Sequence, residues 1–168
     1  MHASIIPPQL GQTILLLMDD TPHFIDTLRE ALRNLPGIAH KQFCVLFCCP
    51  TRYSEHAGGD DPENKMAIAD LWNQEERDFR LAEEQLARAR AVLEESGVDA
   101  ASISTKVAVE DSLLEAAVAE LKQGGYSGVI LTQAHREIAH RVLGKGITDV
   151  FRNVPQAAVW MIDAALEM

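Results

Sequence analysis

The sequence predicts a single-domain α/β fold, in which a doubly wound parallel sheet carries helices on both faces. Strand-sized apolar runs alternate with helical patterns along the whole chain, which implies right-handed crossover connections. Several runs, such as "ILLLM", "FCVLFCC" and "GVIL", are almost continuously apolar, as expected for parallel strands that are covered on both faces. The 168 residues, of which 47% are hydrophobic, suffice for one domain with a sizeable core.

Five predicted strands share an apolar sequence bounded by polar or turn residues: they span residues 13–18, 42–49, 102–109, 128–132 and 157–163. The first 12 residues contain Pro7 and Pro8, and we expect them to form a flexible arm. The folded domain is therefore expected to span residues 13–168.

Four helical patterns connect these strands, and they cover about residues 22–35, 62–96, 112–123 and 147–153. The first has Thr21 as its predicted N-cap and Pro22 as its first helical residue. The second is long and stops at Gly97, and the pattern leaves open whether it forms one helix or two.

Charge and cysteine content exclude several classes of function. A net charge of -10 opposes binding to DNA or RNA, because nucleic-acid-binding proteins usually present a basic surface. No apolar run approaches the roughly 20 residues of a membrane span, and we expect a cytoplasmic protein without a membrane partner. Cys44, Cys48 and Cys49 lack CxxC spacing and are expected to be free thiols in a reducing compartment. A redox role for Cys48 or Cys49 stays open, since reactivity depends on exposure and local charge.

A ligand is expected at the carboxyl ends of the strands, where the strand order of an open parallel sheet reverses. Asp19 and Asp20 follow the first predicted strand, and Thr132 to His135 follow the fourth. The loops that carry these residues are expected to line one opening.

Two segments resemble the universal stress protein family, and the resemblance covers nearly the whole chain. "ILLLMDDT" is similar to the family's first strand, and "VILTQAHREIAHRVLGKGITDVFRNVPQAAVWMID" is similar to its closing segment of strand, loop, short helix and last strand. The resemblance implies the strand order 3-2-1-4-5. It also implies a homodimer through the last strand, from Ala157 to Asp163, where an apolar sheet edge invites pairing with another chain.

The ligand loop departs from the family's ATP-binding pattern, G-x-x-G-x9-G-[ST]. Its first two glycines align with Thr132 and His135, the third with Gly144 after a shortened spacer, and the Ser/Thr position with Lys145. Glycine lets backbone amides approach a phosphate closely, whereas a Cβ obstructs that approach. The loop is therefore expected to be degenerate and not to bind ATP in the usual way.

The same resemblance places Asp19 at the family's aspartate that contacts the base or the ribose, but Asp20 adds a second carboxylate that repels phosphate. The candidate cofactor-binding residues are therefore Asp19, Thr132, His135, Gly144, Lys145 and Gly146.

A local basic cluster within this acidic chain offers a second possibility, a small anionic ligand. It contains His135, Arg136, His140, Arg141 and Lys145, of which Lys145 is the best anion-binding candidate. The alternative is a solvated face that pairs with surface acids. The histidines lack the spacing and neighbours of a metal site, so no metal is expected.

The sequence offers no motif for catalysis, neither a nucleophile elbow nor a dinucleotide fingerprint. His23 beside Asp19 and Asp20 could form an acid–base pair, although a surface histidine in a first turn is commoner. The leading interpretation is a non-enzymatic binding or regulatory module of the stress response, without a cofactor and with an unknown protein partner. Two alternatives stay open: a member that binds ATP with magnesium and hydrolyses it slowly, and a structural subunit that docks through Ser54 to Lys65 or the long helix.

Overall fold

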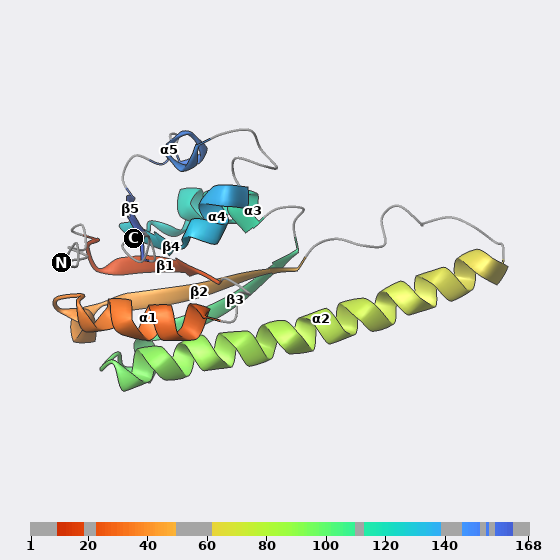
Figure 1. Cartoon of the computed structure of the whole chain (residues 1–168), viewed down its shortest axis with the longest axis horizontal. Coiled ribbons are helices and arrows are strands. Elements are labelled where there is room, and N and C mark those ends of the chain that lie inside the picture. Colours follow the sequence, from red (N-terminus) through yellow and green to blue (C-terminus); the bar gives the residue numbers. More distant parts are fainter. Residues whose placement is uncertain are drawn as a thin grey trace.

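One parallel sheet forms the centre of the molecule (Figure 1). The computed structural model describes residues 10–18, 23–49, 62–109, 113–138, 146–151, 154 and 157–162. The sheet has five strands in the order β3-β2-β1-β4-β5, and every neighbouring pair is parallel. The strands are β1 (Thr13–Leu17), β2 (Gln42–Cys49), β3 (Ile103–Val109), β4 (Gly128–Leu131) and β5 (Ala158–Met161). The predicted fold class and strand order are thus confirmed.

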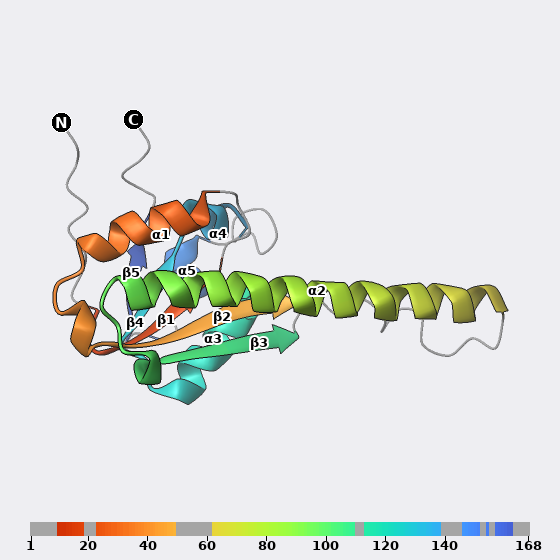
Figure 2. The ribbon, with the colours of Figure 1, turned by 90° about the horizontal axis from the view of Figure 1, so that it is seen from below.

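Helices cover both faces of this sheet (Figures 1 and 2). They are α1 (Phe24–Arg33), α2 (Pro62–Glu95), α3 (Leu113–Gly124), α4 (Gln133–Ile138) and α5 (Ile147–Val150), with short 3-10 turns η1 (Ile38–His40) and η3 (Ala100–Ser102). Helices α1 and α2 lie on one face, and α3, α4 and α5 lie on the other (Figure 1). This two-sided covering is what the nearly continuous apolar strands require.

The core has two halves because neighbouring residues of a strand point to opposite faces. Ile14 and Leu16 of β1 pack toward α1 and α2, whereas Leu15 and Leu17 pack toward α3. All four side chains are fully buried. Burial of such a side chain stabilises the fold by about 1.5–3 kcal/mol, so β1 is the main anchor between the two halves.

The predicted elements differ from the observed ones mainly at their ends. Helix α1 begins at Phe24 rather than at Pro22, and His23 is its N-cap without a side-chain hydrogen bond. Thr21 and Pro22 lie outside the described residues. Helix α2 is one continuous helix, which answers the question that its pattern left open. Helix α4 was not expected at all.

The chain is anchored to the domain from Leu10 onward. Leu10 is buried in the core, and the backbone N–H of Gln42 donates to the carbonyl of Gln12 at 2.7 Å. Gly11 has a φ of 75°, and a Cβ there would lie 2.4 Å from the hydroxyl oxygen of Ser127. Only glycine therefore fits at this entry to β1. Residues 1–9 of the expected arm lie outside the described residues.

None of the helices within the described residues is both long enough and apolar enough to cross a membrane.

Candidate ligand site at the carboxyl ends of the strands

The topology places a crevice between the carboxyl ends of β1 and β4. The chain builds β2 and β3 on one side of β1 and then places β4 and β5 on the other side, so the strand order reverses between β1 and β4. Ligands of open parallel sheets bind outside the strand ends at this point. The chain leaves β1 at Met18 and leaves β4 at Thr132, so these two residues mark the crevice.

The imidazole of His135 bridges these two strand ends. Its Nδ1 lies 2.9 Å from the backbone nitrogen of Thr132, and its Nε2 lies 2.9 Å from the carbonyl oxygen of Met18. His135 is 2% exposed and Thr132 is 1% exposed. The side chain of His135 therefore points into the fold at the position where the topology predicts a ligand.

These two contacts fix the tautomer of His135. The backbone N–H of Thr132 is a donor, so Nδ1 must accept and carries no proton. The Met18 carbonyl is an acceptor, so Nε2 carries the ring proton and donates it. An imidazole that satisfies both groups is neutral.

A helical turn replaces a glycine-rich loop after β4. The backbone N–H of His135 donates to the carbonyl of Thr132 at 3.1 Å, while the His135 side chain accepts from the Thr132 N–H. These two hydrogen bonds have the spacing of a capping box, in which the side chain of the third helical residue accepts from the backbone N–H of the cap residue. The Thr132 N–H thus donates within the first turn of α4. In a phosphate-binding loop the same group would donate to the ligand.

The position of His135 bears on the possible basic cluster around an anion. Its buried imidazole is hydrogen bonded within the fold. His140, Arg141 and Lys145 of that cluster lie outside the described residues, and the side chain of Arg136 is not described.

The other candidate residues are placed only in part. Gly146 directly precedes α5, and its carbonyl accepts from the N–H groups of Asp149 and Val150 at 3.0 and 3.1 Å. Helix α5 is only four residues long, so its dipole provides little attraction for an anion. Asp19 and Gly144 lie outside the described residues. Thr132 and His135 are thus the candidate residues that the structure brings together.

His23 lies at the exposed N-cap of α1. Asp19 and Asp20, its proposed acid–base partners, lie outside the described residues. Within the part of the chain that the structure describes, no group of three or more His, Cys, Asp or Glu side chains is arranged to hold a metal ion.

Sequence reasoning missed the role of Met18, whose backbone carbonyl anchors the imidazole. Half of the arrangement has a local signal: Thr132 and His135 are three positions apart, as the two members of a capping box are. The other half has none, because the contact with Met18 joins residues 117 positions apart.

Comparison with solved structures identifies the fold. The universal stress protein from Archaeoglobus fulgidus in complex with dAMP matches with a TM-score of 0.51 and 14% identity, over 91% of this chain and 98% of that chain. A universal stress protein in complex with cAMP matches with a TM-score of 0.56 and 15% identity, over 91% and 97%. A universal stress protein family member from Burkholderia pseudomallei matches with a TM-score of 0.50 and 20% identity, over 94% and 100%.

The sequence itself carries less information about ancestry. No model of a known protein family matches it, and no curated protein is significantly similar to it. At these identities the solved structures establish that the chain has the universal stress protein fold. What a fold binds must be argued from the site.

Proposed function

We propose that this chain is a cytoplasmic, non-enzymatic universal stress protein-like module with a binding or regulatory role in the stress response. We propose further that it does not bind ATP in the usual way. The fold supports the first statement, since two neighbours in fold were solved with dAMP or cAMP and span the same length of chain. The side chains at the strand ends support the second.

One observation carries the proposal: the His135 imidazole uses the Thr132 N–H and bridges the ends of β1 and β4 through the Met18 carbonyl. A phosphate in that crevice would have to displace a buried side chain with two hydrogen bonds of 2.9 Å. Leaving those buried partners unsatisfied costs about 1–3 kcal/mol for each group. This cost opposes every ligand that needs the backbone amides of the loop.

Thermal unfolding with and without ATP and magnesium tests the proposal. A ligand present at 100 times its Kd stabilises the native state by about 2.7 kcal/mol, which raises the Tm of a domain of this size by about 5–10 °C. We expect no rise in Tm at millimolar ATP, ADP or AMP. A rise of several degrees, together with heat of binding in a titration calorimeter, would contradict the proposal.

A double variant sharpens this test. Thr132→Gly with His135→Gly restores glycine at the two family positions and removes the imidazole from the crevice. We expect this variant to acquire measurable affinity for ATP if the rest of the loop is competent. The matched control is His40→Gly, which removes an exposed histidine on the amino-terminal side of β2.

The second candidate function is an adenine-nucleotide-binding protein that hydrolyses ATP slowly with magnesium. The nucleotide complexes of two neighbours in fold favour it. In this alternative Asp19, Gly144 and Lys145 hold the nucleotide from outside the described residues. Lys145→Ala should then weaken nucleotide binding at least tenfold, whereas under our first proposal it changes nothing that calorimetry detects.

We also propose a homodimer through the edge of β5. Strand β5 pairs with β4 alone among the described strands, and it is the outermost strand of the sheet. The N–H groups of Ala158 and Ile162 donate to residues on the β4 side. Residues alternate along a strand, so the N–H groups of Val159 and Met161 point outward and are available to a second copy.

Proline at one of these outward positions tests the dimer without breaking the β4–β5 pairing. Val159→Pro removes one outward N–H, and we expect it to convert a dimer into a monomer in analytical ultracentrifugation at micromolar concentration. The control Ala158→Pro removes an inward N–H and should instead lower stability. A parent protein that is already monomeric would contradict the proposed dimer.

A further inference from the structure

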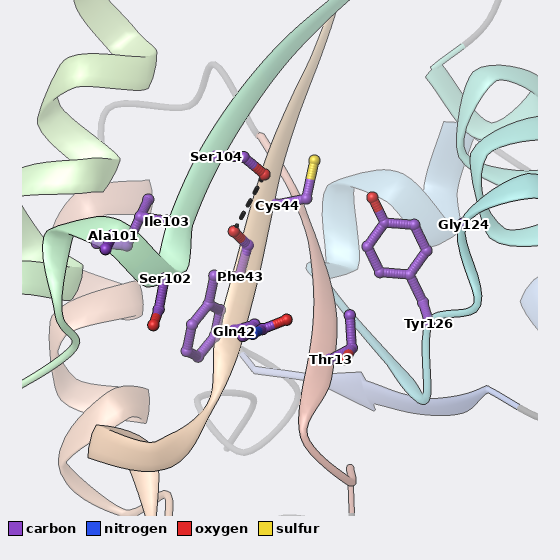
Figure 3. Close-up of a pocket in the computed structure, with 10 residues that line it drawn as sticks. All are labelled: Thr13, Gln42, Phe43, Cys44, Ala101, Ser102, Ile103, Ser104, Gly124 and Tyr126. Carbon is purple, nitrogen blue, oxygen red and sulfur yellow. Dashed lines mark hydrogen bonds between the residues drawn. The ribbon is translucent and has the colours of Figure 1, made fainter.

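Helix α2 is anchored to the domain at one end and projects from it at the other. The turn η3 that follows it contributes Ala101 and Ser102 to the wall of a cavity of about 240 Å³ at the amino ends of the strands (Figure 3). The opposite end of α2 extends past the carboxyl ends of β2 and β3 (Figure 2). No other described helix or strand lies beside the part that projects (Figures 1 and 2). We call the first half of α2, residues 62–78, the projecting half.

The face by which α2 packs on the domain has the spacing of a coiled coil. Ala82, Leu86, Ala89 and Leu93 are buried, and they follow one another at intervals of four, three and four residues. Residues at these intervals form one stripe along a helix. Phe79 is the next position of the stripe toward the start of the helix, and it is 37% exposed. The stripe therefore leaves the domain at Phe79.

The same spacing continues through the projecting half. Counting back from Phe79 by alternate steps of four and three residues reaches Glu75, Trp72, Ile68 and Lys65. Because α2 is one continuous helix, these positions lie on the continuation of the face that packs on the domain. The stripe thus has two large apolar residues in its middle, with a basic residue on one side and an acidic residue on the other.

A projecting helix with an apolar stripe needs a partner. Most of the stability of helices in proteins comes from the packing of an apolar face against other elements. No described element supplies that packing to Ile68 and Trp72, whereas a second molecule can supply it.

We propose that the projecting half of α2 pairs in antiparallel orientation with the same segment of a second copy of this chain. The sequence is complementary to itself when the twofold axis lies beside residue 70. Ile68 then faces Trp72 of the second copy, and Lys65 faces Glu75 of the second copy. Because the axis is twofold, each of these contacts occurs twice. Two apolar layers are therefore enclosed by two pairs of opposite charge.

Other arrangements of the same two helices are less favourable. An antiparallel pair shifted by seven residues places Glu75 against Trp72 of the second copy, and it places Lys65 against Ala82, which is already buried in its own domain. A parallel pair places Lys65 against Lys65 and Glu75 against Glu75, and like charges at an interface oppose association. Charge complementarity thus selects one register.

The apolar layers provide the attraction, and the charges determine the register, because exposed ion pairs contribute little affinity of their own. With only two apolar layers, we expect a reversible contact that depends on protein concentration. The contact is separate from the proposed β5 dimer, since α2 lies over β2 and β3 whereas β5 is at the far edge of the sheet (Figure 2).

Exchange of the two charges tests the register. Lys65→Glu and Glu75→Lys each place like charges opposite one another, and the double variant restores opposite charges. The two positions are ten residues apart, so they are not neighbours within one helix and rescue requires a second copy. In sedimentation equilibrium we expect each single variant to have half the mass of the parent, and the double variant to have the parent mass.

Three results would overturn the proposal: single variants with the parent mass, a double variant without rescue, or a parent that is monomeric at every concentration. The first is also the result expected if another segment of this chain, or a different protein, covers the stripe. Loss of the β5 dimer alone is recognised separately, because Val159→Pro changes the mass without altering the response to charge exchange.

Chemical cross-linking tests which residues meet. Position 71 lies beside the proposed twofold axis, whereas position 73 lies on the opposite side of the helix. In a protein with Cys44, Cys48 and Cys49 replaced by serine, a short reagent with two thiol-reactive groups should join two copies of Leu71→Cys. The matched control Asn73→Cys should stay monomeric on a denaturing gel. Equal yields of covalent dimer from both positions would contradict the antiparallel register.

Discussion

The two ends of the same sheet differ in how their side chains are arranged. At the carboxyl ends of β1 and β4, where the topology favours a ligand, the His135 imidazole bridges both strands. At the amino ends of β1, β2 and β3, a cavity of about 240 Å³ lies beside a free thiol. Strand order determines where a ligand of this fold is expected, but the side chains at the strand ends determine which groups are available to it.

Single residues account for this difference. At the carboxyl end, one imidazole accepts from the Thr132 N–H and donates to the Met18 carbonyl. At the amino end, Gly124 brings no side chain, and the Tyr126 ring lies against its backbone. A Cβ at Gly124 would lie 2.2 Å from Cε2 of that ring. One side chain that is present and one that is missing thus distinguish the two ends of the sheet.

The largest effect is expected from His135→Ala. This substitution leaves the Thr132 N–H and the Met18 carbonyl buried without the imidazole, and it should lower the free energy of unfolding by about 3 kcal/mol. Urea denaturation measures the loss. The control His40→Ala removes an exposed side chain and should stay within about 0.5 kcal/mol of the parent. Equal stability of both variants would mean that the His135 bridge does not stabilise the carboxyl end of the sheet.

The next effect is expected from Gly124→Ala, at the other end of the sheet. Alanine in place of a helical glycine ordinarily adds about 1 kcal/mol of stability. Here the new Cβ collides with the ring of Tyr126, and we expect a net loss of about 2 kcal/mol. Gln123→Ala, at an exposed neighbour in α3, is the control. A gain in stability for Gly124→Ala would show that Tyr126 is free to leave its place beside the cavity.

A smaller effect is expected from alkaline pH. Because the pKa of Tyr126 is raised in the folded state, its contribution to stability is fully present below the unfolded tyrosine pKa of about 10. It is lost progressively as the pH rises above that value, by about 1 kcal/mol per pH unit. The sequence has two tyrosines, Tyr53 and Tyr126, so Tyr126 alone is observed in the variant Tyr53→Phe. Its absorbance at 295 nm should show phenolate only as the protein unfolds. Ionisation near pH 10 in the folded protein would contradict the buried hydrogen-bonded phenol.

The smallest effect is expected from Lys106→Ala. Lys106 is half exposed, so its ion pair with Glu120 should contribute less than about 1 kcal/mol, and added salt should reduce that contribution. Urea denaturation at low and high salt measures it, with Lys122→Ala as the exposed control. A loss of several kcal/mol would mean that the hydrogen-bonded group of Lys106, Glu120 and Tyr126 is a structural support.

Sequence reasoning located the elements better than it located the site. All five strands lie within two residues of their predicted ends, because continuous apolar runs such as "TILLL" are local signals. Helix α4 was not predicted because its start depends on a hydrogen bond from the Thr132 N–H to the side chain of His135. The His135 bridge was not predicted either, because it needs the carbonyl of Met18 from a distant strand. The amino-end cavity depends on Gly124 and Tyr126 meeting Cys44 across the sheet, which no local pattern encodes.

Helix α2 gives the molecule a long reach. Among the side chains that the structure describes, burial on this helix begins at Ala82, while the helix itself starts at Pro62 and extends well past the sheet (Figure 2). The preceding 20 residues correspond to about 30 Å of helix. A fluorophore at the start of α2 therefore lies at the end of a long helix rather than on a compact domain. Its fluorescence anisotropy should rise when a molecule binds to that end of the helix, even if the molecule does not contact the sheet.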